Sequence, residues 1–175
     1  MDLNTTLWVQ QTNVYEVNLR QYSAEGSFSA FAKQLPRLRA MGVETLWFMP
    51  ITPIAQKNKK GSMGSPYACS DYTSVNPEFG TLDDFKQLVK QAHEMGFKVI
   101  IDWVANHTGW DHKWTVEHPD YYERDSTGNF KAASGMEDII ELDFKNPALR
   151  KAMKDAMMYW IEETDIDGYR CDLAF

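Results

Sequence analysis

The chain has 175 residues, of which 43% are hydrophobic, so its composition indicates one folded domain and excludes a disordered chain. The net charge of −7 argues against a nucleic-acid-binding surface, which needs clustered Lys and Arg. The two cysteines have no ligand-like spacing, which excludes a disulfide framework and a zinc site. No stretch is apolar enough for a signal peptide or a bilayer span, so no membrane partner is expected; the compartment, secreted, periplasmic or cytoplasmic, stays open.

Four segments are predicted to be strands: 14–22, 43–50, 97–104 and a last one that begins at Gly168. Each of the last three follows a predicted helix that stops near a glycine, at Gly42, Gly96 and Gly168. Glycine tolerates the left-handed conformation that commonly ends a helix. The chain therefore repeats one unit, in which a helix ends, turns and opens a buried strand.

Three amphipathic helices are predicted between these strands. Ser27 caps the first helix, which Pro36 interrupts or restarts. Thr81 caps the second, and Asp84 three residues on makes a capping-box partner. Asn146 caps the third, with a proline at its first position. Each carries an apolar stripe at helical spacing, so each is expected to cover a sheet.

Alternation of strands and helices predicts an α/β fold with parallel strands and right-handed crossovers. The connections after the second and third strands are long, at 51–80 and 105–145, and long loops at strand ends carry the sites of (β/α)8 barrels. No glycine-rich fingerprint follows the first strand, which argues against a dinucleotide-binding fold. Because a complete barrel has eight strands, residues 1–175 are predicted to be the N-terminal half of a TIM (β/α)8 barrel, with 105–145 as an excursion after strand three.

The last predicted strand carries a charged pair. Side chains alternate along a strand, so Arg170 and Asp172 share one face, and Tyr169 and Cys171 share the other. One interpretation is a structural salt bridge, since a charged pair is costly to bury without partners. The other is catalytic: Asp172 lies at the carboxyl end of the strand, and the neighbouring guanidinium favours its ionised form. An ionised, positioned carboxylate is what a covalent glycosidase uses as its nucleophile.

A second group of polar residues closes the third predicted strand. Asp102 faces inward by alternation, and Asn106 and His107 follow at the rim. By themselves these residues also suit a capped turn with a hydrogen-bonded Asn and His. Together with Arg170 and Asp172, however, they would converge at one end of one sheet. Such convergence predicts a functional site.

Four motifs in this order resemble the α-amylase family, glycoside hydrolase family 13. "DWVANH" at 102–107 resembles the family's first signature, and "GYRCD" at 168–172 resembles the second, which carries an arginine and a nucleophilic aspartate. "SPYACSDYTSVNPEFGTLDDF" at 65–85 resembles the segment after strand two. "LPRLRAMGVETLWFMPI" at 35–51 is typical of the family's first helix and second strand. The resemblance runs from about residue 14 to the end of the sequence.

The resemblance implies a role for each matching residue. Asp172 would be the nucleophile, and Arg170 would hold it ionised and oriented. His107 would bind a hydroxyl of the reactive sugar, and Tyr67 would stack against its ring. Asp102 would be a strand-end partner within the substrate site.

The resemblance also implies a metal. Asn106 and Asp143, in "IIELDF", match positions that lie near a structural calcium in the family. Carboxylate and carbonyl oxygens suit Ca²⁺. Calcium is therefore the expected cofactor, and no organic cofactor is expected.

The implied function is that of a retaining glycoside hydrolase acting on α-1,4 bonds of starch or maltooligosaccharides, or of a transglycosylase on the same substrates. The family takes its general acid from a glutamate of strand five, so this chain is expected to be truncated, inactive alone, and to need the missing C-terminal half or to self-associate through open sheet edges. One alternative is a non-catalytic carbohydrate-binding or partner half-barrel of the same family. Another is a different barrel enzyme that converged on a similar rim.

Overall fold

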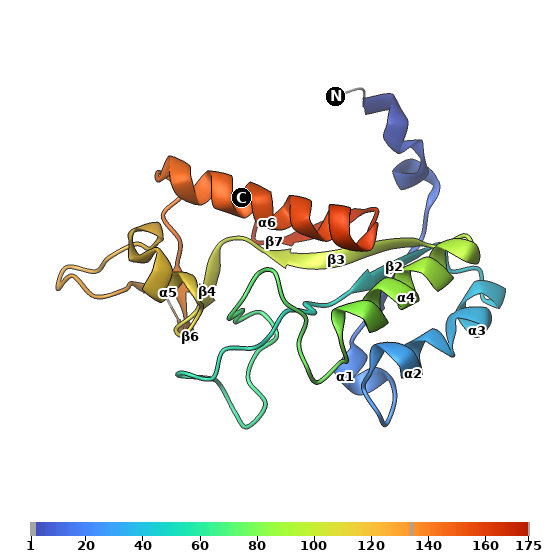
Figure 1. Cartoon of the computed structure of the whole chain (residues 1–175), viewed down its shortest axis with the longest axis horizontal. Helices are drawn as coiled ribbons and strands as arrows, with labels where there is room; N and C mark the ends of the chain where they lie inside the picture. The colour runs from blue at the N-terminus through green and yellow to red at the C-terminus, as the bar shows by residue number, and fades with distance from the viewer. Residues whose placement is uncertain (1–2, 134, 175) are drawn as a thin grey trace.

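The main sheet holds four parallel strands in the order β1-β2-β3-β7 (Figure 1). The computed structural model describes residues 3–133 and 135–174. The strand bounds are β1 Val14–Val17, β2 Thr45–Phe48, β3 Lys98–Val104 and β7 Gly168–Asp172. Parallel neighbours joined through helices are the arrangement predicted for the first half of a (β/α)8 barrel.

The helices begin at the capping residues that the sequence predicts. Thr81 and Asp84 form a reciprocal capping box, with Thr81 N–H donating to Asp84 Oδ2 at 2.8 Å. Asn146 Oδ1 accepts from Ala148 N at 2.9 Å. None of the described helices is long and apolar enough to cross a membrane. The helices of and around the main sheet are η1 Leu3–Gln11, α1 Leu19–Tyr22, α2 Phe28–Ala32, α3 Leu35–Ala40, α4 Leu82–Glu94 and α6 Pro147–Thr164.

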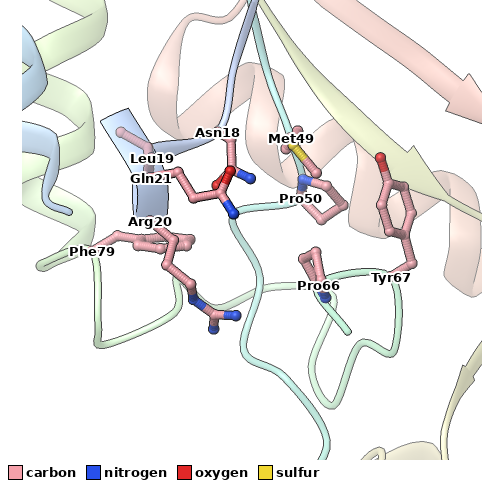
Figure 2. A pocket seen from close by; sticks show the side chains of 9 residues that line it. All are labelled: Asn18, Leu19, Arg20, Gln21, Met49, Pro50, Pro66, Tyr67 and Phe79. Atoms are coloured by element: carbon pink, nitrogen blue, oxygen red, sulfur yellow. The ribbon is translucent and has the colours of Figure 1, made fainter. Parts of the chain in front are cut away.

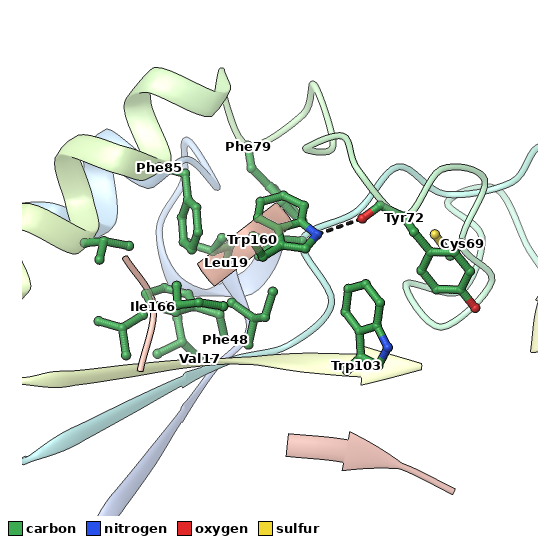
Figure 3. Close-up of a cluster of buried hydrophobic side chains, with 14 of the residues drawn as sticks. Val17, Leu19, Phe48, Cys69, Tyr72, Phe79, Phe85, Trp103, Trp160 and Ile166 are labelled. Carbon is green, nitrogen blue, oxygen red and sulfur yellow. Dashed lines mark hydrogen bonds between the residues drawn. The ribbon is translucent and has the colours of Figure 1, made fainter. Parts of the chain in front are cut away.

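One face of the sheet packs against α2, α4 and α6 around a cluster of aromatic rings (Figure 3). The Phe85 ring of α4 lies 5.1 Å from Phe28 of α2 and 6.1 Å from Phe48 of β2. It also lies 6.1 Å from Trp160 of α6, whose indole N–H donates to the carbonyl of Tyr72 at 2.7 Å. Burial of these large rings stabilises the packing of the helices on the sheet.

Two of the predicted boundaries are wrong. The strand predicted over 14–22 ends at Val17, and a single helical turn follows, because Leu19 turns into the core rather than continuing the sheet. Gly168 does not end a helix: α6 stops at Thr164, and Asp165 adopts the left-handed conformation at φ 59°. Aspartate tolerates that conformation because its short polar side chain bonds locally, which leaves Gly168 free to open β7.

The two long segments both lie beyond the carboxyl end of β3 (Figure 1). Residues 105–145 contain a second, antiparallel sheet in the order β4-β6-β5. Gly109 joins this sheet to the 51–80 segment, since its N–H donates to the Cys69 carbonyl at 2.8 Å and an added Cβ would meet Ala55 Cβ at 2.0 Å. The elements are β4 His107–Gly109, α5 Trp114–Glu117, η2 Pro119–Tyr121, β5 Ala132–Ala133 and β6 Met136–Glu141.

At the opposite end of the sheet, one carboxylate ties the entry of β7 to β3. Asp167 accepts the Val99 N–H at 2.8 Å and pairs with Lys98 at 2.7 Å and with His93 at 2.8 Å. Burial by itself would raise the pKa of Asp167, but the hydrogen bonds from Lys98 and Val99 outweigh it and hold the pKa below 3.8. The charged form of Asp167 therefore stabilises the fold.

We expect Asp167→Asn to lower the free energy of unfolding at neutral pH by about 1–3 kcal/mol. A depressed folded-state pKa contributes stability that is present above the unfolded value, 3.8, and lost as pH falls through the folded value. The difference between the parent and the variant should therefore be constant near neutral pH and shrink below pH 3.8. Urea unfolding at several pH values measures it, with Asp165→Asn, whose side chain is 94% exposed, as the matched control.

Candidate active site

The carboxyl ends of β3 and β7 bring three predicted site residues together. The strand register pairs Asp102 with Arg170 and Val104 with Asp172. Arg170 Nη1 donates to Asp102 Oδ1 at 3.0 Å and to Asp172 Oδ1 at 2.8 Å. Tyr169, one residue away, points to the helix side, where its ring lies 5.3 Å from Trp103. One guanidinium therefore bridges two carboxylates on the face of the sheet that the helices leave uncovered.

Asp102 is the buried centre of this network, with a side chain that is 0% exposed. Its Oδ2 accepts from Trp47 Nε1 at 3.3 Å and from the Tyr67 hydroxyl at 3.2 Å, in addition to Arg170. Burial raises the pKa of Asp102, and the hydrogen bond and positive charge of Arg170 oppose that rise. Since every one of these partners donates a hydrogen, the site is arranged around the carboxylate form of Asp102.

Trp47 belongs to the site, although the motifs did not indicate it. The guanidinium carbon of Arg170 lies 4.9 Å from the Trp47 ring centroid, within the range of a cation–π contact. The signal that could have found it is alternation in β2: Leu46 and Phe48 face the core, so Trp47 must face the other side. The β2–β3 register, which pairs Trp47 with Ile100, then places it beside Asp102.

Tyr67, His107 and Asp172 line one cavity of about 360 Å³, called here the Asp172 cavity. The hydroxyl of Tyr67 is committed to Asp102, and burial, with the negative charge of Asp102, raises the pKa of Tyr67 to about 12. His107 is only 2% exposed. Burial lowers the pKa of His107, although a hydrogen bond with the Tyr67 backbone opposes the shift, so the imidazole is neutral at neutral pH.

A second cavity, of about 250 Å³, lies on the other side of Tyr67 at the ends of β1 and β2 (Figure 2). Met49, Pro50 and Phe79 contribute its apolar wall. Arg20 lines it as well and pairs with Glu78 at 2.8 Å. Tyr67 therefore separates two hollows on the same rim of the sheet.

The two predicted calcium residues, Asn106 and Asp143, do not line the Asp172 cavity. Asn106 Nδ2 contacts His107 Nδ1 at 3.3 Å, and the Asn106 carbonyl accepts from Leu142 N at 3.2 Å. Asp143 Oδ1 accepts from Lys145 N at 3.0 Å. Calcium requires six to eight oxygens, and the described residues include no group of three or more acidic, His or Cys side chains that could hold a metal. Calcium stays a prediction.

The sequence matches the family model of the alpha-amylase catalytic domain over residues 9–135 and 122–174. It is 36% identical to an alpha-1,4-glucan:maltose-1-phosphate maltosyltransferase of Rhodospirillum rubrum, over 85% of this chain and 25% of that protein. It is 29% identical to alpha-amylase 3 of Dictyoglomus thermophilum, over 95% of this chain and 37% of that protein.

Solved structures of alpha-amylases share the fold of this chain. An alpha-amylase from Lactobacillus plantarum superposes with a TM-score of 0.91 at 41% identity, covering 95% of this chain and 39% of that one. A maltogenic alpha-amylase from Thermotoga neapolitana gives a TM-score of 0.88 at 41% identity, covering 93% and 39%. The chain thus spans between 25% and 39% of the length of these relatives.

Proposed function

This chain belongs to the alpha-amylase family, and on that premise we propose that its site serves the retaining cleavage or transfer of α-1,4-glucosidic bonds in starch-like glucans. The observation that carries the proposal is the bond from Arg170 to Asp172 at the edge of a cavity that His107 and Tyr67 also line. A positioned, ionised carboxylate beside a cavity with an aromatic wall is what covalent glycoside chemistry requires. Because the relatives are longer, the activity is proposed for the whole protein that contains these residues.

Asp172 is the proposed nucleophile. Its Oδ1 is held by Arg170 at 2.8 Å, and its side chain is 20% exposed, so the carboxylate is both oriented and reachable. An Asp172 oxygen forms a bond to the anomeric carbon while the bond to the leaving oxygen breaks and that oxygen takes a proton. Water, or a glucan hydroxyl in the transfer reaction, then displaces Asp172, gives its proton to the group that acted as the acid, and restores the anomeric configuration.

Tyr67 and His107 are proposed to hold the reacting sugar. The Tyr67 hydroxyl already donates to Asp102, so the ring face, rather than the hydroxyl, is available to the apolar face of a sugar. The neutral imidazole of His107 offers a hydrogen bond to a sugar hydroxyl without placing a second positive charge beside Arg170.

Asp102 does not supply the proton that the leaving oxygen needs. Retaining enzymes use two carboxyl groups about 5–5.5 Å apart, one of them protonated. The oxygens of Asp102 accept hydrogens from Trp47, Tyr67 and Arg170, so Asp102 has no hydrogen directed at a substrate. The family resemblance implies a glutamate of a later strand for this role, so the acid is proposed to come from another part of the whole protein.

Maltoheptaose assays test this function in a polypeptide extended to the length of the curated relatives. The proposal expects shorter oligosaccharides whose newly formed reducing end is first the α-anomer, followed by proton NMR before mutarotation. Transfer appears as oligosaccharides longer than the substrate, and hydrolysis as shorter ones alone. A β-anomer as first product contradicts the proposal. Glucan binding without any turnover favours the carbohydrate-binding alternative instead.

Trp47 provides a prediction about positioning. Trp47→Phe keeps a ring under Arg170 but removes the N–H that donates to Asp102. We expect it to lower kcat by about tenfold with little change in KM, since one hydrogen bond to a charged group is lost away from the sugar. Trp47→Leu removes the ring as well and should lower kcat further. A change in KM alone would place Trp47 against the substrate rather than behind Arg170.

A further inference from the structure

A buried aspartate and a lysine from different long segments meet on the wall of the Asp172 cavity. Lys60 Nζ, from the 51–80 segment, lies 3.0 Å from Asp138 Oδ1 in β6. Both side chains line the cavity that also contains Asp172. The pair is 78 residues apart in sequence (138 minus 60), so only the tertiary fold brings it to this place.

The two members of the pair are exposed very differently. The Asp138 side chain is 6% exposed, whereas that of Lys60 is 57% exposed. Among the residues that the structure describes, Lys60 is the one side-chain partner of the Asp138 carboxylate, and it reaches only Oδ1. A buried carboxylate is costly unless its lone pairs are satisfied. The remaining acceptor positions of Asp138 and the remaining donors of Lys60 are therefore available to a ligand.

The chemistry of the pair suits two neighbouring hydroxyl groups. A carboxylate only accepts hydrogen bonds, and an ammonium only donates them. One hydroxyl of a sugar can donate to Asp138 while the adjacent hydroxyl accepts from Lys60, at the 3.0 Å spacing of the pair. Met136 and Ile139 add apolar surface to the same cavity, which suits the C–H face of a pyranose ring.

We propose that Lys60 and Asp138 form a binding subsite for the vicinal hydroxyls of a glucosyl unit next to the one at Asp172. This inference rests on the proposed function for the identity of the ligand. The competing role is a structural tie, in which the ion pair only holds the 51–80 segment against β6.

Binding of maltotetraose tests the subsite in a polypeptide extended to the length of the curated relatives, with Asp172→Asn in every form so that the sugar is not turned over. Lys60→Met and Asp138→Asn should each raise the dissociation constant by about tenfold, because each removes hydrogen bonds to a charged group. In the double variant the dissociation constant should rise by less than the product of the two single increases, since both side chains act on one pair of hydroxyls. Lys59→Met is the matched control: Lys59 is exposed, bonds only Gln56 among the described residues, and does not line the cavity, so its binding should match the parent.

The Met136 methyl group reports the location of the sugar directly. Its proton and carbon shifts should move on titration with maltotetraose in the parent chain and in Lys59→Met, and should move far less in Lys60→Met. The Met136→Leu variant assigns the signal. Thermal unfolding of the same variants provides the second readout, because a structural tie lowers Tm without changing the affinity.

Unchanged affinity in both single variants, with or without a lower Tm, overturns the subsite and leaves the proposed function standing. Absence of maltotetraose binding by the extended polypeptide at millimolar sugar overturns both the subsite and the proposed function. A Lys60-dependent affinity, combined with no turnover of glucan by the extended polypeptide that keeps Asp172, preserves the subsite and overturns the proposed function.

Discussion

Replacing Asp172 with asparagine should lower kcat on maltooligosaccharides by about 10⁴- to 10⁶-fold in the extended polypeptide, the scale seen when a covalent enzyme loses its nucleophile. Asparagine has the same shape and can still accept from Arg170, so the bond of 2.8 Å to Nη1 need not be lost. Its amide cannot form the glycosyl ester, however, and the first displacement stops. KM should change little, because the groups that hold the sugar remain.

The matched control for this variant is Asp165→Asn, the same change at a side chain that is 94% exposed and lies at the opposite end of β7. It should keep the parent kcat. Mass spectrometry of quenched protein offers a second measurement, since a glycosyl adduct should form on Asp172 in the parent and be absent in Asp172→Asn. Retention of a few per cent of the parent kcat by Asp172→Asn would exclude Asp172 as the nucleophile.

Replacing Arg170 with methionine should be the most destabilising change at the site, lowering the free energy of unfolding by about 3 kcal/mol. The variant leaves Asp102, with a side chain that is 0% exposed, without its only positively charged partner among the described residues. Trp47 and Tyr67 still donate to it, which limits the loss. Urea unfolding at neutral pH measures the difference.

The pH dependence of the free energy of unfolding identifies why Arg170→Met loses stability. Burial raises the pKa of Asp102, and loss of Arg170 should raise it further. A raised folded-state pKa means that stability is present below the unfolded value and is lost as pH rises through the folded value. The deficit of Arg170→Met should therefore shrink as pH falls from 7 toward 4, and Asp102→Asn should restore part of the stability when combined with it. A deficit that stays constant with pH would assign the loss to packing against Trp47 instead.

These two variants separate the roles of the two carboxylates that share Arg170. Asp172 is partly exposed and lines the cavity, so its loss should affect turnover and leave the fold intact. Asp102 is buried and accepts from three side chains, so its network should matter for stability first and for turnover through Arg170. Because Arg170 donates to both carboxylates, we expect a change at Asp102 to affect the site, and a change at Arg170 to affect both the site and the sheet edge.

Much of the site and of the fold could be predicted from local pattern alone. The two-residue spacing of Arg170 and Asp172 requires one face of a strand, because side chains alternate, and β7 confirms it. The caps at Thr81 and Asn146 depend on hydrogen bonds within a few residues, and both are present. The left-handed conformation of Asp165 was not predicted, because glycine is the commoner residue in that conformation at the end of a helix and Gly168 lies nearby.

By itself, the sequence determined the order of the four main-sheet strands and of the helical segments between them, the residues on each strand face and the family, since these depend on periodicity and on short motifs within one segment. Only the tertiary structure decided that Trp47 lies under Arg170, that Asp102 is the buried centre, and that Lys60 reaches Asp138. Those contacts join residues far apart along the chain. Their geometry is set by strand register and by the packing of long segments, and no local pattern carries that information.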